Sequence, residues 1–344
     1  TVRNSTLTAT GKNTVAIYAP AGGDSTVTLD NAVIKSPYGV QVCAGNLVVK
    51  GDTRITTTAA NVASTKTGDG PIPDGAAISI VNRAGYGDAA TTGSSVGKVT
   101  IEGSPVLIAQ GKGAKALDVY AWDSASAQQD WPEDAEHVTI SGGTFSQAVP
   151  EAFCAPGYAP KKNADGTYSV VGWYETGVDT NGDGVADTWT IRNEGDLAAF
   201  RDKVNSTVTF AGCTVTLTKD LDLSDMGTWI PIGEGNAGGA SKNGGFFAGT
   251  FEGGNHLIAN LHVSETKLGE GAGLFGWVRG ATIRNLRVSG SILANVNGAA
   301  GIIGVVESNY DGNARTVIEN VHNEGDTVRG SKAGGIVGDI RRGG

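Results

Sequence analysis

A short phrase that recurs along the chain restricts its fold more than any other feature of the sequence. The stretch GAGLFGWVRGATIRNLRVSG, residues 271–290, joins a glycine-flanked apolar run to a strand-like segment with an asparagine inside it. The apolar run returns as GLFGWV (273–278), GIIGVV (301–306) and GIVGDI (335–340). The asparagine segment is LIANLHV (257–263), TIRNLRV (282–288) and VIENVHN (317–323), with Asn260, Asn285 and Asn320 spaced by 25 and 35 residues. Such self-similarity indicates a repeat architecture.

Each segment alternates apolar and polar residues, which predicts strands with one buried face. A unit of this length cannot bury that face alone, but stacked copies can, at the spacing of about 4.8 Å between paired strands. We therefore expect a right-handed parallel β-helix in which each copy is one coil. Glycines permit its sharp corners, and the three asparagines would form a hydrogen-bonded ladder at one of them.

The first half of the chain repeats more loosely, in strand–corner–strand segments at 25–36, 46–57, 98–109 and 137–147. The expected fold is all-β, with two tandem β-helix domains at 1–150 and 191–344. The segment between them, 151–190, is expected to be a capping hairpin and a linker. Asp165-Gly166 between two strand-like runs predicts the hairpin. Residues 58–77 and 120–136 are expected to be surface loops.

One helix is expected, over NEGDLAAFRDKVN (193–205), as a cap on the second β-helix. Asn193 is a suitable N-cap, and acidic residues follow it in the first turn. Leu197, Phe200 and Val204 share one face, which would cover the end of the core.

The composition of the sequence limits the classes of partner that the chain is expected to bind. The 53 glycines are more than twice the ordinary share, without the strict period of collagen. A net charge of −9 disfavours nucleic acid and anionic membranes, and no apolar run is long enough to insert into a bilayer. Cys43, Cys154 and Cys213 lack a metal-binding spacing; Cys43 and Cys213 lie in strand patterns and are expected to be buried, and a Cys154–Cys213 bridge stays open. Because the chain begins and ends inside repeat phrases, we expect a piece of a larger multidomain protein.

Residues 189–344 resemble the GLUG-repeat β-helix modules of large bacterial surface proteins, which also occur in non-catalytic regions of IgA-cleaving metalloproteases. The likeness rests on EGDLAAFRDKVNSTVTFAGCTVTLTKDLDLSDMGTWIPIG, FAGTFEGGNHLIANLHV and AGLFGWVRGATIRNLRVSG. The resemblance implies an extracellular location on a bacterial cell surface, or secretion. It does not imply protease activity, because the zinc motif H-E-x-x-H is absent from the sequence.

The motif DTNGDGVAD (179–187) predicts a structural calcium site. Asp179, Asn181 and Asp183 occupy positions 1, 3 and 5 of a calcium loop, Val185 would offer its carbonyl at position 7, and Asp187 stands at position 9. Position 12 is Thr190 instead of the bidentate glutamate of an EF-hand. The ion would stiffen the junction between the two domains; the alternative is a polar linker without an ion.

The insertion at 120–136 is the candidate contact region. It carries Tyr120, Trp122, Asp123, Trp131 and Glu133, and an exposed indole beside a carboxylate suits a sugar ring. We expect an extracellular adhesin or stalk that binds a glycan or a host surface protein; the alternative interpretation of the two tryptophans is packing alone. The competing function is a polysaccharide lyase or hydrolase, which would need converging carboxylates in a groove.

Overall fold

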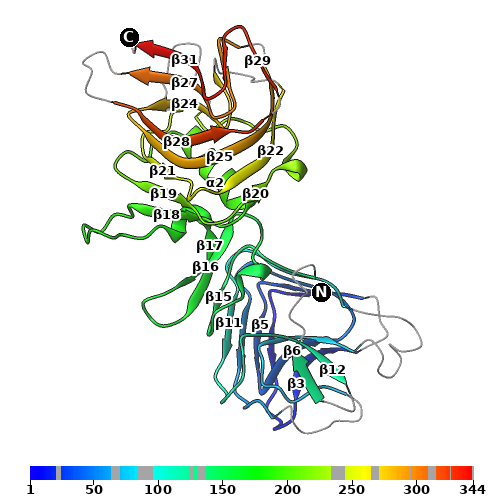
Figure 1. The fold of residues 1–344 in the computed structure, drawn as a ribbon. Helices are drawn as coiled ribbons and strands as arrows, with labels where there is room; N and C mark the ends of the chain where they lie inside the picture. The colour runs from blue at the N-terminus through cyan, green and yellow to red at the C-terminus, as the bar shows by residue number, and fades with distance from the viewer. Residues whose placement is uncertain are drawn as a thin grey trace. The chain divides into compact units, whose positions relative to one another are not determined.

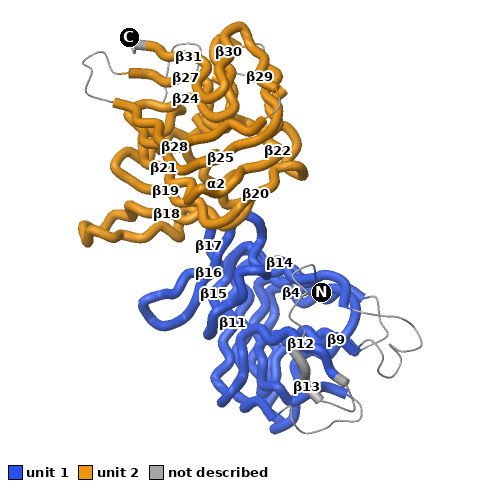
Figure 2. The backbone as a smooth tube through the Cα atoms, viewed as in Figure 1, with its two compact units in different colours: residues 1–172 blue, residues 173–344 orange. Residues whose placement is uncertain are grey.

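The computed structural model describes residues 1–20, 25–62, 70–83, 96–123, 127–130, 137–233, 245–264, 271–294, 296–308, 315–325 and 327–342. The chain divides into two compact units, Thr1–Gly172 (unit 1) and Trp173–Gly344 (unit 2) (Figure 2). Each unit consists mainly of β-strands paired in parallel, so the expected all-β class is confirmed (Figure 1).

Unit 1 is built on three sheets that the chain visits in turn. The first contains β1 (Val2–Arg3), β4 (Thr26–Asp30), β7 (Gly45–Lys50), β10 (Val96–Ile101) and β14 (Val138–Ile140). The second contains β2 (Thr6–Thr8), β5 (Val33–Ser36), β8 (Arg54–Thr57), β11 (Val106–Ala109) and β15 (Thr144–Phe145). The third contains β3 (Val15–Ala19), β6 (Tyr38–Val42), β9 (Ile78–Asn82) and β12 (Leu117–Asp123). Neighbouring strands in each of these rows are parallel, and we call one passage through the three sheets a circuit.

Two antiparallel additions make the second and third sheets mixed. The hairpin predicted around Asp165-Gly166 is confirmed as β16 (Tyr158–Lys162) and β17 (Tyr168–Gly172), and β17 extends the second sheet beside β15. The hairpin therefore belongs to unit 1, and the segment 151–190 expected between two domains is divided between the units. In place of the loop expected at 120–136, β12 continues to Asp123 and pairs with β13 (Ala127–Asp130).

Unit 2 also has three sheets, of which the first is the largest. It contains β18 (Thr188–Ile191), β19 (Thr214–Leu217), β20 (Leu221–Asp222), β21 (Thr250–Glu252), β22 (Leu257–Val263), β25 (Thr282–Leu293), β28 (Val317–Asn323) and β29 (Thr327–Arg329). The second contains β23 (Gly271–Ala272), β26 (Gly298–Ala300) and β30 (Ala333–Gly334). The third contains β24 (Phe275–Arg279), β27 (Ile303–Ser308) and β31 (Val337–Arg342). The glycine phrases thus pair with one another in parallel, as copies of one circuit.

The predicted helix is confirmed as α2 (Glu194–Asn205). The Asn193 side chain accepts a hydrogen bond from the Asp196 backbone N–H at 2.8 Å, which satisfies one donor of the first turn. Leu197, Phe200 and Val204 are each fully buried. Phe200 packs against Phe247 and Phe251, with ring centroids 5.4 and 6.0 Å apart, so α2 covers an aromatic part of the unit 2 core.

In each unit, a residue with positive φ forms the corner that follows a strand of the first sheet. In unit 1 this residue is Asn4 (φ 47°) or Asn31 (φ 51°), and glycines Gly51 and Gly103 take the place in the next two circuits. Asparagine tolerates this region better than most residues because its short amide can bond to nearby backbone. The Asn31 Oδ1 atom accepts the backbone N–H of Asp52 at 2.9 Å, so one corner is tied to the next.

All three cysteines are free thiols in the structure, and a Cys154–Cys213 bridge, which would join unit 1 to unit 2, stays an open alternative. Cys43 is buried as expected, and burial raises the pKa of its thiol to about 11. Cys213 is only partly buried, so the same expectation is wrong for that residue. Trp229 and Trp277 are also buried, each at 1% exposure.

Candidate functional site

Two of the aromatic residues expected to face a ligand are buried instead. Tyr120 is 1% and Trp122 is 3% exposed, and both pack with Cys43, Ile72 and Val81. The expectation that they present open ring faces is wrong, because residues 70–76 fold over this face of β12. For Asp123 the structure describes the backbone only, and Trp131 and Glu133 lie outside the described residues.

The cover over β12 is held by a buried aspartate that the sequence analysis did not single out. Asp74 is 1% exposed, and its Oδ2 atom accepts hydrogen bonds from Ser79 Oγ at 2.5 Å and Tyr120 Oη at 2.6 Å. Its Oδ1 atom accepts the backbone N–H of Ala76 at 3.0 Å. Burial raises the pKa of this carboxyl group, and the hydrogen bonds oppose part of that rise.

Gln41 completes the attachment of the same segment. Its amide forms a two-point contact with the backbone of Ile72: the side-chain nitrogen donates to the Ile72 carbonyl at 3.2 Å, and the side-chain oxygen accepts the Ile72 N–H at 2.7 Å. The Gln41 nitrogen also lies 3.2 Å from Asp74 Oδ2. This contact imitates strand pairing, so the segment is fixed to the sheet by both backbone and side chain.

Charged groups gather around this cover. Tyr18, Gln41, Ser79 and Asp118 stand side by side on neighbouring strands of the third sheet. Asp118 is 1% exposed and accepts a hydrogen bond from Lys115 Nζ at 2.7 Å. Arg83, 2% exposed, donates to Tyr18 Oη at 3.3 Å and to the Gly70 carbonyl at 3.0 Å. The carboxyl groups of Asp74 and Asp118 therefore lie near one another, but both are buried and hydrogen-bonded.

The residues of the expected calcium loop lie together on an exposed connection. Val178 and Thr188 pair in antiparallel fashion and close the loop at its base. Asp179 accepts the N–H groups of Gly184 at 2.7 Å and Gly182 at 2.6 Å, and these bonds lower the pKa of its carboxyl group. Asn181 and Asp183 accept N–H groups in the same way, from Asp183 and Val185. The side-chain oxygens are therefore drawn towards the inside of the loop.

The donor set of this loop is compatible with a hard cation, yet it is used within the loop. Asp187 accepts the N–H and the hydroxyl of Thr180 at 2.8 to 3.3 Å. An accepted N–H occupies one lone pair of a carboxylate oxygen and leaves another free. Within the described residues no group of three or more His, Cys, Asp or Glu side chains is arranged to hold a metal ion. Calcium at Asp179, Asn181, Asp183, Val185 and Asp187 remains a prediction.

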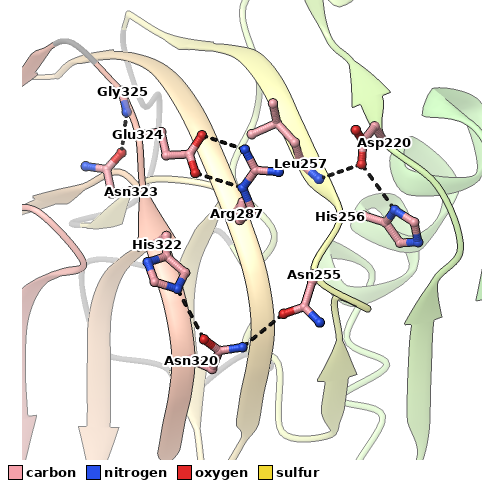
Figure 3. A network of polar contacts seen from close by, with 10 residues as sticks. All are labelled: Asp220, Asn255, His256, Leu257, Arg287, Asn320, His322, Asn323, Glu324 and Gly325. Carbon is pink, nitrogen blue, oxygen red and sulfur yellow. Dashed lines mark hydrogen bonds and ion pairs between the residues drawn. The ribbon is translucent and has the colours of Figure 1, made fainter.

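Asparagines of neighbouring circuits in unit 2 are hydrogen-bonded as predicted, but Asn255 takes the place expected for Asn260; Figure 3 shows the contact between Asn320 and Asn255. Asn320 stands opposite Asn285, and its amide donates to Asn285 Oδ1 and to Asn255 Oδ1, both at 2.9 Å. Asn255 also donates its backbone N–H to the Asn285 carbonyl. The ladder is therefore 255–285–320, whereas Asn260 lies at a register shift in β22 and donates to Asp222 at 2.8 Å.

Ion pairs between circuits flank the ladder on the outer face of the large sheet (Figure 3). Glu252 accepts Arg284 Nε at 2.7 Å and the Asn285 amide at 3.0 Å. Arg287 forms a two-point pair with Glu324, and Asp220 bonds to His256 Nδ1 at 3.1 Å. These side chains are partly exposed, so each pair contributes little to stability, but together they oppose a slip in register.

Comparison with known proteins gives no assignment, since no protein family, curated protein or solved structure matches this chain. The likeness of residues 189–344 to GLUG-repeat modules accordingly stays a prediction. No helix in the described part of the chain is long and apolar enough to cross a membrane. Function must therefore be argued from the sheets, the buried Asp74 cluster and the exposed loop at 179–187.

Proposed function

We propose that the chain is a stalk of an extracellular bacterial surface protein, folded as two right-handed parallel β-helices. The observation that carries the proposal is the register: strand after strand pairs in parallel with its equivalent in the previous circuit, in all three sheets of each unit. A stack of this kind transmits load between neighbouring circuits and has no need of a groove. Its GLUG-like phrases support the bacterial surface location.

The Asp74 cluster supports a structural role over catalysis. Hydrolysis of a polysaccharide needs two carboxylates that face the same bound sugar. Asp74 and Asp118, which lie near each other, are each 1% exposed and are engaged by Ser79, Tyr120 and Lys115. A group that must reach a polymer cannot stay enclosed in this way, so we assign the cluster to holding residues 70–76.

The loop at 179–187 has a separate role in the proposal. Calcium bound by its oxygens would neutralise Asp179, Asp183 and Asp187 and hold the loop closed at its base on Val178 and Thr188. The oxygens of Asp179 and Asp183, which accept N–H groups from within the loop, support this assignment. The ion would be structural.

A combined assay separates a stalk from an adhesin and an enzyme. The purified chain is applied to a broad glycan array and incubated with plant and host polysaccharides, in calcium and in chelator. A stalk gives no selective retention and no oligosaccharide release, and it unfolds stepwise under load when pulled by its ends. Selective retention that Trp131→Ala abolishes would make the chain an adhesin. Oligosaccharide release that Asp74→Asn or Asp118→Asn abolishes, with the fold intact, would make it an enzyme.

A further inference from the structure

One side of unit 1 is both polar and buried. The described part of the chain contains ten buried polar or charged residues: Ser36, Gln41, Thr53, Thr57, Asp74, Ser79, Arg83, Asp118, Asp196 and Glu307. Five of these ten gather at the third sheet and its cover, namely Gln41, Asp74, Ser79, Arg83 and Asp118. Burying polar groups costs free energy unless they are hydrogen-bonded, and the stacking of circuits does not require them here. Such a local departure from the pattern of a scaffold is typical of a functional site.

These groups lie on the outer face of the third sheet. The inner face carries Val40, Val42, Ile78 and Ile80, which belong to the core of unit 1. Because side chains alternate along a strand, the residues between them point outwards. The outward residues that contact the cover are Gln41 and Cys43 of β6, Ser79 and Val81 of β9, and Tyr120 and Trp122 of β12. We call this set the receptor face.

The cover, residues 70–76, meets the receptor face in the way that a bound peptide would. Ile72 is 1% exposed and packs in the apolar cluster of Cys43, Val81, Tyr120 and Trp122. Asp74 accepts hydrogen bonds from Ser79 Oγ at 2.5 Å and Tyr120 Oη at 2.6 Å. The Gln41 amide pairs with the carbonyl and the N–H of Ile72. The receptor face therefore offers an apolar site, donors for an acidic group and an amide that recognises the peptide backbone.

Two prolines prepare the cover for this contact. Pro71 precedes Ile72 and Pro73 follows it, and the Asp74 N–H donates to the Ile72 carbonyl at 2.9 Å, which closes a tight turn around Pro73. A proline fixes its own φ and restricts the residue before it, so less conformational freedom is lost when such a segment binds. Ile72 and Asp74 are both buried, whereas Pro71 is exposed. The sequence Pro-Ile-Pro-Asp thus contains the groups that the receptor face recognises.

The cover leaves one donor of the receptor face unused. Among the described residues, the indole N–H of Trp122 has no hydrogen-bond partner, although the side chain is only 3% exposed. An unpaired buried donor costs free energy, so a ligand with one more acceptor than the cover would gain a bond. The cover therefore does not use every group that the receptor face provides.

We infer that the receptor face is a binding site for a proline-containing peptide segment that has an apolar residue and, two positions later, an acidic residue. The cover occupies this site from within the same chain. Because the cover is tethered beside the site, it competes at a high effective concentration, and a partner must displace it. The stacking of circuits, on which the stalk proposal rests, does not depend on this site.

Fluorescence anisotropy with a labelled peptide tests the inference. The peptide has the sequence of residues 70–75, Gly-Pro-Ile-Pro-Asp-Gly, and two altered peptides carry Ile72→Gly or Asp74→Ala. The receptor is the full chain with Ile72→Gly and Asp74→Ala together, which disable the cover and leave the receptor face unchanged. In this background Tyr120→Phe removes one donor of the receptor face, and Thr139→Ala removes an exposed hydroxyl of β14 as the matched control. Titrations run to on the order of 1 mM, because a short peptide contacts the chain through few groups.

The chain with the disabled cover should bind the peptide, and the Thr139→Ala control should bind it equally. Either altered peptide, and the Tyr120→Phe variant, should bind at least about tenfold more weakly, because each lacks a contact of the cover. The unaltered chain should also bind at least about tenfold more weakly, since its own cover fills the site. A chain with the disabled cover that is folded but does not bind the peptide would overturn the inference. Equal binding by the unaltered chain would also overturn it.

Thiol labelling of Cys43 gives a second measurement, with Cys154→Ser and Cys213→Ser to remove the other thiols. If the doubly altered chain does not fold, Ile72→Gly alone takes its place. Cys43 packs with Ile72, so loss of the isoleucine should speed labelling and the peptide should slow it again. Labelling that saturating peptide leaves unchanged would contradict binding at the receptor face.

Discussion

Replacing Asn285 tests whether the corner residue stabilises unit 2 through its backbone as well as its side chain. Asn285 has φ 53°, donates its amide to Glu252 at 3.0 Å and accepts the Asn320 amide at 2.9 Å. In Asn285→Ala both bonds are lost, and a residue that disfavours positive φ is forced into it. A left-handed conformation costs an ordinary residue about 1–2 kcal/mol, and each bond contributes about 0.5–1.5 kcal/mol net, here near the low end because the groups are partly exposed.

The expected loss for Asn285→Ala is therefore about 2–3 kcal/mol of the free energy of unfolding of unit 2. Asn285→Gly is the matched variant, since it loses the same bonds but accepts positive φ, and it should cost about 1–2 kcal/mol. Urea unfolding followed by tryptophan fluorescence reports mainly on unit 2, which holds four of the six tryptophans. Equal losses for the two variants would refute the backbone contribution, and no loss for either would refute the ladder.

Three further predictions concern the other features. Burial raises the pKa of Asp74 above its value of 3.8 in the unfolded chain, so the contribution of this carboxyl group to the stability of unit 1 is fully present below pH 3.8 and is lost as pH rises through the folded pKa. The stability of Asp74→Asn should therefore fall less than that of the unaltered chain over this pH range, as measured by paired melting curves. Parallel pH profiles for the two proteins would contradict this. If calcium fills the 179–187 loop, chelation and Asp183→Ala should each lower the melting temperature of unit 2, whereas the control Asp225→Ala should not. At a free calcium concentration one hundred times Kd, the ion would add about 2.7 kcal/mol to the free energy of unfolding. Asn193→Ala removes the helix cap and should cost about 1 kcal/mol in urea unfolding, while a loss below a few tenths would show that the cap bond to Asp196 is replaced.

The elements that could be predicted are those fixed by neighbours in the sequence. The helix at 194–205 follows from Asn193 and the spacing of Leu197, Phe200 and Val204, and the hairpin follows from Asp165-Gly166. Parallel pairing of the glycine phrases followed from their recurrence, because equal segments stack on equal segments. In each case a local pattern and the tertiary structure require the same residues.

The asparagine ladder shows where resemblance between phrases misleads. LIANLHV and TIRNLRV look alike, yet Asn260 and Asn255 both have positive φ, and only pairing decides which one meets Asn285. Phe251 stands opposite Ile283, and Gly253 and Gly254 then bring Asn255 beside Asn285. Which of the two asparagines lies beside Asn285 depends on strand register, and the sequence of a single strand does not determine its register.

The candidate site was least predictable because it depends on contacts distant in sequence. Asp74 lies in a stretch expected to be a surface loop, and it meets Tyr120, 46 residues later, only after the third sheet has formed. Without that cover Tyr120 and Trp122 would face solvent, as their polar surroundings in the sequence indicated. A local hint was the unbroken apolar and aromatic run at 119–122, through which β12 continues past the point where a loop was expected.

Circuit length in unit 1 varies widely although the pairing does not. Val27, Leu47, Val99 and Val138 stand in one row of the first sheet, yet they are separated by 20, 52 and 39 residues of chain. The row is set by contacts between neighbouring strands, so residues added outside the strands leave it intact. The connections of such a scaffold can therefore change while its core stays the same. Evolution can lengthen a connection, and a peptide can be grafted into one, without changes to the strands that hold its two ends.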